Sequence, residues 1–314
     1  MYFPYLRGRQ FELIALREYA EQFGSNNHII PIIEPVKETF NSLKLALTKI
    51  LDSDITPALI LNPKVGEIKS LSNLEKEKMI LTELKNVLVD DKRWIPAFIV
   101  TTGYKELEKH VSNHNYHSVM IICSESTNTS DQNFQSLILC DQVKYIVSKE
   151  NRTLKRFLHK TEKNLIRIDD SFNAQKQNKD YLNISEEKFT EEHLFYTEDG
   201  YYGFSDYTVL ENEFKEGGAL PYAVAIHLTY QKDDDIIWVR HFVSETNLGR
   251  ENIQGKFAEA AKKAVRFLDS ENIHTNASEE LRCYYNNGKG TYPGLGMVKK
   301  ISIKNHLELV NSIL

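Results

Sequence analysis

Acidic and histidine side chains stand at the ends of several apolar segments of this sequence. Glu34 follows the run IIPII, Asp169 follows NLIRI and Asp206 follows GFS. His227 lies in the alternating segment AVAIHLTY. Carboxyl groups and an imidazole gathered in one pocket could move protons during hydrolysis of a phosphate ester or nucleotide. We take Glu34, Asp169, Asp206 and His227 as candidate catalytic residues.

Other roles for these acids stay open. Carboxylate oxygens are also the ligands that hard cations such as Mg²⁺ prefer, although no particular set of metal ligands is indicated. An acid or hydroxyl residue after a strand can also cap the following helix. Asp170 before Ser171, and Asp206 two residues before Thr208, fit that structural role.

Basic and polar residues at the same kind of position could bind an anion. Arginines beside a helix N-terminus are suited to phosphate or carboxylate groups, although they could equally be solvated or pair with surface acids. The candidate ligand- or anion-binding residues are Arg7, Arg9, Gln10, Asn62, Lys64, Asp170 and His241. A structural role is the main alternative for His241, whereas pairing with His227 would favour phosphodiester cleavage.

The elements that must position these residues alternate regularly. Apolar segments followed by helical patterns occur at 29–35, 57–63, 95–102, 118–126, 143–149 and 164–170. Continuous apolar strands alternating with amphipathic helices are typical of a parallel sheet covered on both faces. No GxGxxG motif follows the first segment. We therefore predict a (β/α)8 TIM-like barrel rather than an open dinucleotide-binding sheet.

Two more strands are needed to close this barrel, and we place them at 201–210 and 222–230. The polar residues 171–200 form an insertion after the sixth strand. The acidic turn after residue 230 predicts a hairpin that extends the eighth strand into 236–244.

The remaining elements are expected to complete one domain over residues 1–314. A helix at 253–271 would close the outer ring, and residues 272–314 would form a loop and a terminal helix packed on the barrel. A helix at 10–23, preceding the first strand, would begin at the C-terminal face of the barrel, where barrel enzymes keep their active sites. Alternation within AVAIHLTY would point His227 into the barrel near the same face.

Composition narrows the classes of function. The chain has 314 residues and a formal net charge of −5, so no overall attraction to nucleic acid or anionic membranes is expected. Its three cysteines are too scattered for a disulfide framework or zinc site. No segment approaches the ~20 apolar residues of a membrane span, and no signal-peptide pattern opens the chain. We expect a cytoplasmic protein without a membrane partner.

Several segments resemble a bacterial family related to the phage beta-protein family. They are MYFPYLRGRQFELIALRE, IIPIIEPV, IRIDDSF, GFSDYT, PYAVAIHLTY and VRHFVS. Members of that family are often encoded beside a small protein with a PD-(D/E)xK nuclease-like pattern. The resemblance implies a role in phage defence or in mobile elements, without an assigned active site. The matching positions are Arg7, Gln10, Glu34, Asp169, Asp170, Asp206, His227 and His241.

We expect a cytosolic barrel component of a phage-defence system that acts with a nuclease-like partner. Its C-terminal barrel face would sense a ligand or contact nucleic acid. The alternative is a phosphodiester or nucleotide hydrolase that uses the strand-end carboxylates and His227. A third hypothesis is an inhibitor that acts on its partner by surface contact. Neither the ligand, nor a reaction, nor the stoichiometry follows from the sequence.

Overall fold

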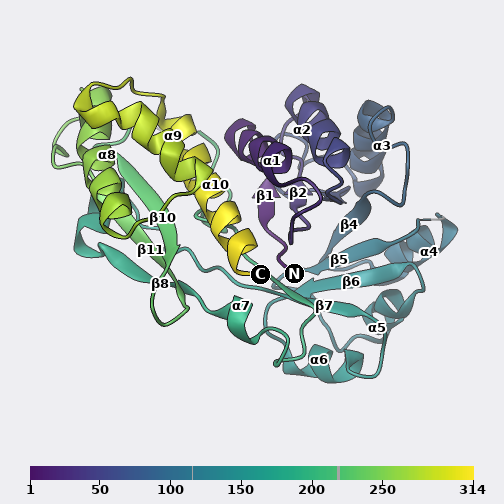
Figure 1. The fold of residues 1–314 in the computed structure, drawn as a ribbon. Coiled ribbons are helices and arrows are strands. Elements are labelled where there is room, and N and C mark those ends of the chain that lie inside the picture. Colours follow the sequence, from purple (N-terminus) through teal and green to yellow (C-terminus); the bar gives the residue numbers. More distant parts are fainter. Residues whose placement is uncertain (115, 218–219) are drawn as a thin grey trace. The chain divides into compact units, whose positions relative to one another are not determined.

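The computed structural model describes residues 1–114, 116–217 and 220–314 and has a mixed α/β architecture (Figure 1). The chain divides into two compact units. Unit 1 comprises Met1–Leu13, Ala20–Asp169 and Phe195–Asp206, and unit 2 comprises Ile14–Tyr19, Asp170–Leu194 and Tyr207–Leu314. Each unit contains its own sheet. The single domain expected over residues 1–314 stays a prediction.

Unit 1 is built on a sheet of eight parallel strands. In spatial order they are β1 (Tyr5–Arg7), β2 (Ile32–Glu34), β3 (Ala58–Ile60), β4 (Ile95–Val100), β5 (Val119–Cys123), β6 (Val143–Ser148), β7 (Asn164–Ile168) and β9 (Gly203–Ser205). The strands follow one another in the sheet in the same order as along the chain, which is typical of parallel strands joined by crossover helices. The predicted (β/α)8 TIM-like barrel is confirmed.

Backbone hydrogen bonds join the first and last strands of this sheet. The amide nitrogen of Phe3 donates to the carbonyl oxygen of Phe204 at 2.8 Å, and that of Tyr5 donates to Asp206 at 2.9 Å. The rings of Tyr2 and Phe204 stack beside these bonds, with their centroids 5.1 Å apart. Pairing across this junction leaves little free edge on the barrel, which is how barrels avoid edge-to-edge association.

Helices alternate with the barrel strands. They are α1 (Gln10–Phe23), α2 (Asn41–Asp52), α3 (Asn73–Leu84), α4 (Tyr104–Asn113), α5 (Gln132–Leu139) and α6 (Arg152–Leu158). Among them, α3, α5 and α6 begin at a side-chain cap. Ser72 and Glu75 form a capping box at the start of α3, and Asp131 caps α5. Within the described ranges of the chain, no helix combines the length and the apolar character that crossing a membrane requires.

The numbering of the barrel strands differs from the prediction. The first strand is Tyr5–Arg7, and the six predicted strands are the second to the seventh. A three-residue strand that ends in arginine is too short and too polar to give an apolar signal. The last strand, Gly203–Ser205, lies inside the predicted segment 201–210.

Unit 2 contains a three-stranded antiparallel sheet. Its strands are, in spatial order, β10 (Ala225–Gln231), β11 (Ile237–Val243) and β8 (Glu186–Thr190). Its long helices are α8 (Ile253–Ser270), α9 (Asn276–Tyr285) and α10 (Leu295–Ile313). α8 and α10 pack on the sheet, and α9 packs against these two helices (Figure 1). The short helical segments of the chain are η1 (Asn178–Asn183), α7 (Glu192–Phe195) and η2 (Asn286–Gly288).

The segment 222–230 is therefore not the eighth barrel strand, and this part of the prediction is wrong. Its hairpin with 236–244 does form, and β8 from the predicted insertion joins that hairpin. The branched face of β10, including Ile226 and Leu228, packs with Ala260 and Ile301 of the long helices. The helix expected at 253–271 and the segment 272–314 contribute to the core of unit 2.

Candidate functional site

Five charged side chains stand at the carboxyl ends of the barrel strands, and we call this group the barrel mouth. Its members are Arg7, Glu34, Lys64, Asp169 and Asp206. Arg7 ends β1 and lies beside Glu34, which ends β2. Lys64 follows β3, whereas Asp169 and Asp206 follow the neighbouring strands β7 and β9. Barrel enzymes place their active sites at this end.

The carboxylate of Glu34 is 2% exposed and is surrounded by donors. The Tyr5 hydroxyl donates to Oε2 at 2.8 Å, and the backbone amide of Lys64 donates to Oε1 at 2.8 Å. The Arg7 Nε lies 3.9 Å from Oε2. Because both oxygens are engaged, Glu34 is better placed to position Arg7 and the Lys64 loop than to transfer a proton.

Two lysines with perturbed pKa values lie next to Glu34. Burial lowers the pKa of Lys64, and the ammonium of Lys76 lowers it further, while Glu34 opposes the shift. Burial also lowers the pKa of Lys76, again opposed by Glu34, and Lys76 is only 3% exposed. Together with Arg7, these lysines place three cations around one carboxylate.

Lys76 was not among the candidates, because its helix reads from the sequence as a solvated, charged element. Its position explains the burial: the capping box starts α3 at Asn73, so Lys76 falls in the first turn, at the end of the helix nearest the strand termini. Only the packing of α3 against the barrel shows that this lysine is shielded from water.

The two aspartates of the mouth are held by different neighbours. The Tyr2 hydroxyl donates to Oδ1 of Asp206 at 2.6 Å. The Arg167 Nε lies 2.7 Å from Oδ2 of Asp169. Burial raises the pKa of Asp169, Arg167 opposes the rise, and the negative charge of Asp206 adds to it. Asp169 is therefore the mouth residue best suited to carry a proton.

The other predicted ligand residues near the mouth have more ordinary surroundings. The Asn62 amide nitrogen donates to the carbonyl of Ile99, and the Ile99 amide donates to Oδ1 of Asn62, both at 2.8 Å. Asn62 thus continues the pairing between β3 and β4. Arg9 precedes α1 and Gln10 is its exposed first residue. Asp170 is exposed and belongs to unit 2.

His227 lies on β10 of unit 2, which is not a barrel strand. It faces His241 of β11, with 2.8 Å between the two Nδ1 atoms, and His241 Nε2 lies 3.2 Å from Glu187. The rings of Phe172 and Tyr181 pack against both histidines. Burial lowers the pKa of both imidazoles. The predicted pairing of the two histidines is therefore present within unit 2.

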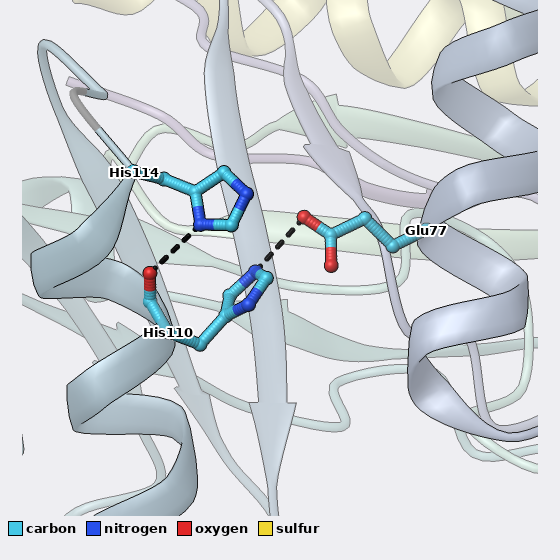
Figure 2. A group of neighbouring side chains, drawn as sticks. All are labelled: Glu77, His110 and His114. Carbon is cyan, nitrogen blue, oxygen red and sulfur yellow. Dashed lines mark hydrogen bonds and ion pairs between the residues drawn. The ribbon is translucent and has the colours of Figure 1, made fainter.

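A further cluster in unit 1 was not among the candidates. Glu77 of α3, His110 of α4 and His114 bring their ligand atoms within 4.8 Å of one another (Figure 2). The i, i+4 spacing of His110 and His114 was visible in the sequence as one face of a helix. Their glutamate comes from the preceding helix, so only the fold brings the three together. Among the described residues, these three form the group of histidine, cysteine or acidic side chains that is close enough together to hold a metal ion with three ligands.

Comparison of the sequence with models of known protein families gives no match, and comparison with curated proteins gives none either.

Proposed function

We propose that the barrel mouth binds a phosphate-bearing ligand, a nucleotide or the end of a nucleic acid, and that the protein senses this ligand in phage defence. The observation that carries the proposal is the placement of Arg7, Lys64 and Lys76 around the carboxylate of Glu34. Buried ammonium groups are costly without enough negative charge nearby. A phosphate group would supply that charge.

The remaining geometry fits the same ligand. A guanidinium recognises phosphate oxygens through parallel hydrogen bonds, and lysines contribute compact positive charge. Glu34 holds Arg7 and the backbone of Lys64 in place for this contact. On the other side of β1, Asp169 and Asp206 offer acceptors for sugar hydroxyls. These aspartates could also hold Mg²⁺ against the phosphate, because both are hard oxygen donors.

The biological setting comes from the sequence resemblance. The segments that resemble the phage beta-protein relatives include the strand ends that carry Arg7, Glu34, Asp169 and Asp206. We propose on this basis that a nuclease-like protein encoded nearby is the partner, and that the occupied mouth signals to it. Copurification of the two proteins from cells that express both tests this step, and failure to associate at micromolar concentration would contradict it.

A phosphodiester or nucleotide hydrolase remains the second candidate. The raised pKa of Asp169 beside the carboxylate of Asp206 favours it, because such pairs divide the roles of proton donor and acceptor. In this version Asp206 accepts a proton from the attacking water as the new P–O bond forms. Asp169 protonates the leaving oxygen as the old P–O bond breaks.

Calorimetric titration with a panel of nucleotides tests the binding proposal. Lys76→Met should weaken binding by about 10-fold or more, since it removes a charge-assisted contact. Lys78→Met is the matched control, because Lys78 lies on the same helix and is exposed. Equal affinity of wild type and Lys76→Met would refute the proposal. Asp169→Asn separates the two candidates, because it should abolish turnover in a hydrolase, whereas a sensor should keep most of its affinity through Arg7 and the lysines.

A further inference from the structure

A cavity of about 370 Å³ opens between the ends of β3 and β4 and the helices α3 and α4 of unit 1. Asn62 and Lys64 line it on the side of β3, and Thr101 and Thr102 line it after β4. Glu77 and His110 line its helical side. Two of the three residues in Figure 2 therefore border a space large enough for a small molecule.

The ligand atoms of this cluster are already close to a metal-binding arrangement. His110 Nε2 lies 3.0 Å from Oε1 of Glu77. Two ligand atoms that are each about 2.0 Å from a tetrahedral zinc ion lie about 3.3 Å from each other. The pair therefore needs only a small shift. His114 is exposed, so its side chain has room to close the remaining distance.

Contacts around the cluster orient its members. The Nδ1 atom of His114 lies 2.9 Å from the carbonyl oxygen of His110. A carbonyl oxygen can only accept, so this contact places the His114 proton on Nδ1 and leaves Nε2 available to a metal. The Tyr116 hydroxyl donates to Glu77 at 2.8 Å, and its ring stacks on His114 with 11° between the planes. Metal-binding histidines and carboxylates typically have such outer partners.

We propose that Glu77, His110 and His114 bind one Zn²⁺ ion and that the ion keeps an exchangeable coordination position at the edge of the cavity. Two imidazoles and one carboxylate are a ligand set that zinc accepts, and sites with three protein ligands leave the fourth position to water or substrate. Of the divalent first-row metals that such ligands bind, zinc is among those held most strongly. This inference goes beyond the proposed ligand of the barrel mouth, since it requires no nucleotide.

Cobalt substitution tests the site directly. The purified chain is freed of metal with a chelator and titrated with Co²⁺ while the visible spectrum is recorded, and Zn²⁺ competition then gives the zinc affinity. We expect one ion per chain in a low-symmetry, four- or five-coordinate environment. We also expect imidazole added to the cobalt protein to change the spectrum. A spectrum that imidazole leaves unchanged would overturn the exchangeable position.

His114→Ala is the decisive variant, because His114 is exposed and its removal should not disturb folding. It should weaken zinc binding by at least about 10-fold, and Tyr116→Phe should have a smaller effect in the same direction. His274→Ala is the matched control. His274 is also an exposed histidine beside a glutamate, with 2.8 Å between its Nδ1 atom and Oε1 of Glu279, but it is not part of the Glu77, His110 and His114 cluster. A wild-type chain that binds no metal, or an equal affinity in His114→Ala, would overturn the proposal.

Discussion

The Nδ1 atoms of His227 and His241 lie 2.8 Å apart on the neighbouring strands β10 and β11. At this distance one Nδ1 atom carries a proton and donates a hydrogen bond to the other, which must be unprotonated. The two imidazoles cannot both be charged while this hydrogen bond is present, because both Nδ1 atoms would then carry protons. Burial holds the pKa of each imidazole below the usual value of 6.5, and His241 lowers that of His227 further. The pair is therefore kept neutral by the fold of unit 2.

This neutrality predicts a loss of stability in acid. Below pH 6.5 the unfolded chain takes up protons on these histidines that the folded pair does not take up. The free energy of unfolding therefore keeps its full value above pH 6.5 and decreases as the pH is lowered below it. Urea unfolding at about pH 7.5 and 5.5 should show a loss of about 1 kcal/mol per histidine. His227→Gln should flatten this dependence, while His274→Gln, at an exposed ion pair, should not. An unchanged slope in His227→Gln would contradict the assignment.

The hydroxyl of Tyr2 should contribute to barrel closure. Tyr2→Phe removes the 2.6 Å hydrogen bond to the buried carboxylate of Asp206 and keeps the ring stacked on Phe204. We expect the free energy of unfolding to fall by about 1–3 kcal/mol, because a buried carboxylate loses a donor. Chemical denaturation followed by circular dichroism measures it. Tyr222→Phe, at an exposed ring, serves as the control, and equal stability of the two variants would disprove this role.

Gly66 should not tolerate a side chain. A Cβ at this position would lie 2.3 Å from the carbonyl oxygen of Val36, in a backbone with φ of +85°. Gly288 has nearly the same φ, +82°, but nothing within 4 Å of the Cβ position. Gly66→Ala should therefore cost about 1–3 kcal/mol more than Gly288→Ala, because only the first adds a steric clash to the backbone strain. Thermal unfolding of both variants measures the difference. An equal loss of stability in the two variants would contradict the predicted clash with Val36.

Lys300 should behave as a buried charge that depends on its partners. Its Nζ lies 2.6 and 2.5 Å from the two carboxylate oxygens of Glu280, and its side chain is 1% exposed. Lys300 Nζ also pairs with Glu18 at 2.8 Å, so Glu280→Ala leaves the ammonium with one partner. The variant should cost about 1–3 kcal/mol, because a buried ammonium loses its charge-assisted hydrogen bonds to Glu280. The double change Glu280→Ala with Lys300→Met should recover part of this loss. A double variant no more stable than Glu280→Ala alone would contradict this account, and unfolding of each variant in urea provides the comparison.

The barrel could be predicted because its inner strands are buried on both faces. Segments such as 95–102 and 118–126 contain continuous apolar runs, and they form β4 and β5. The segment 222–230 differs, because it alternates between branched residues and small or polar ones. Alternation with a period of two is typical of an antiparallel sheet with one buried face, which is what β10 forms. This signal was present and was assigned to the wrong sheet.

The site was predictable only in part, for a related reason. Strand ends can be read from the sequence, so Arg7, Glu34, Asp169 and Asp206 were expected at the mouth. Arg7 reaches it as the last residue of a strand, although a helix start was expected there. Lys76 and Glu77 lie within a charged helix, and no local pattern shows which of its residues turn toward the barrel. Their burial depends on how α3 packs, which is a property of the whole fold.

The pairing of Phe3 with Phe204 has a consequence for synthesis on the ribosome. β1 is translated long before β9, and β8 of unit 2 is translated between β7 and β9. The nascent barrel must wait as an open sheet, with two unpaired borders, until the final strand leaves the exit tunnel. Slow translation between residues 170 and 202 would prolong that vulnerable interval, and chaperone capture is expected to peak there.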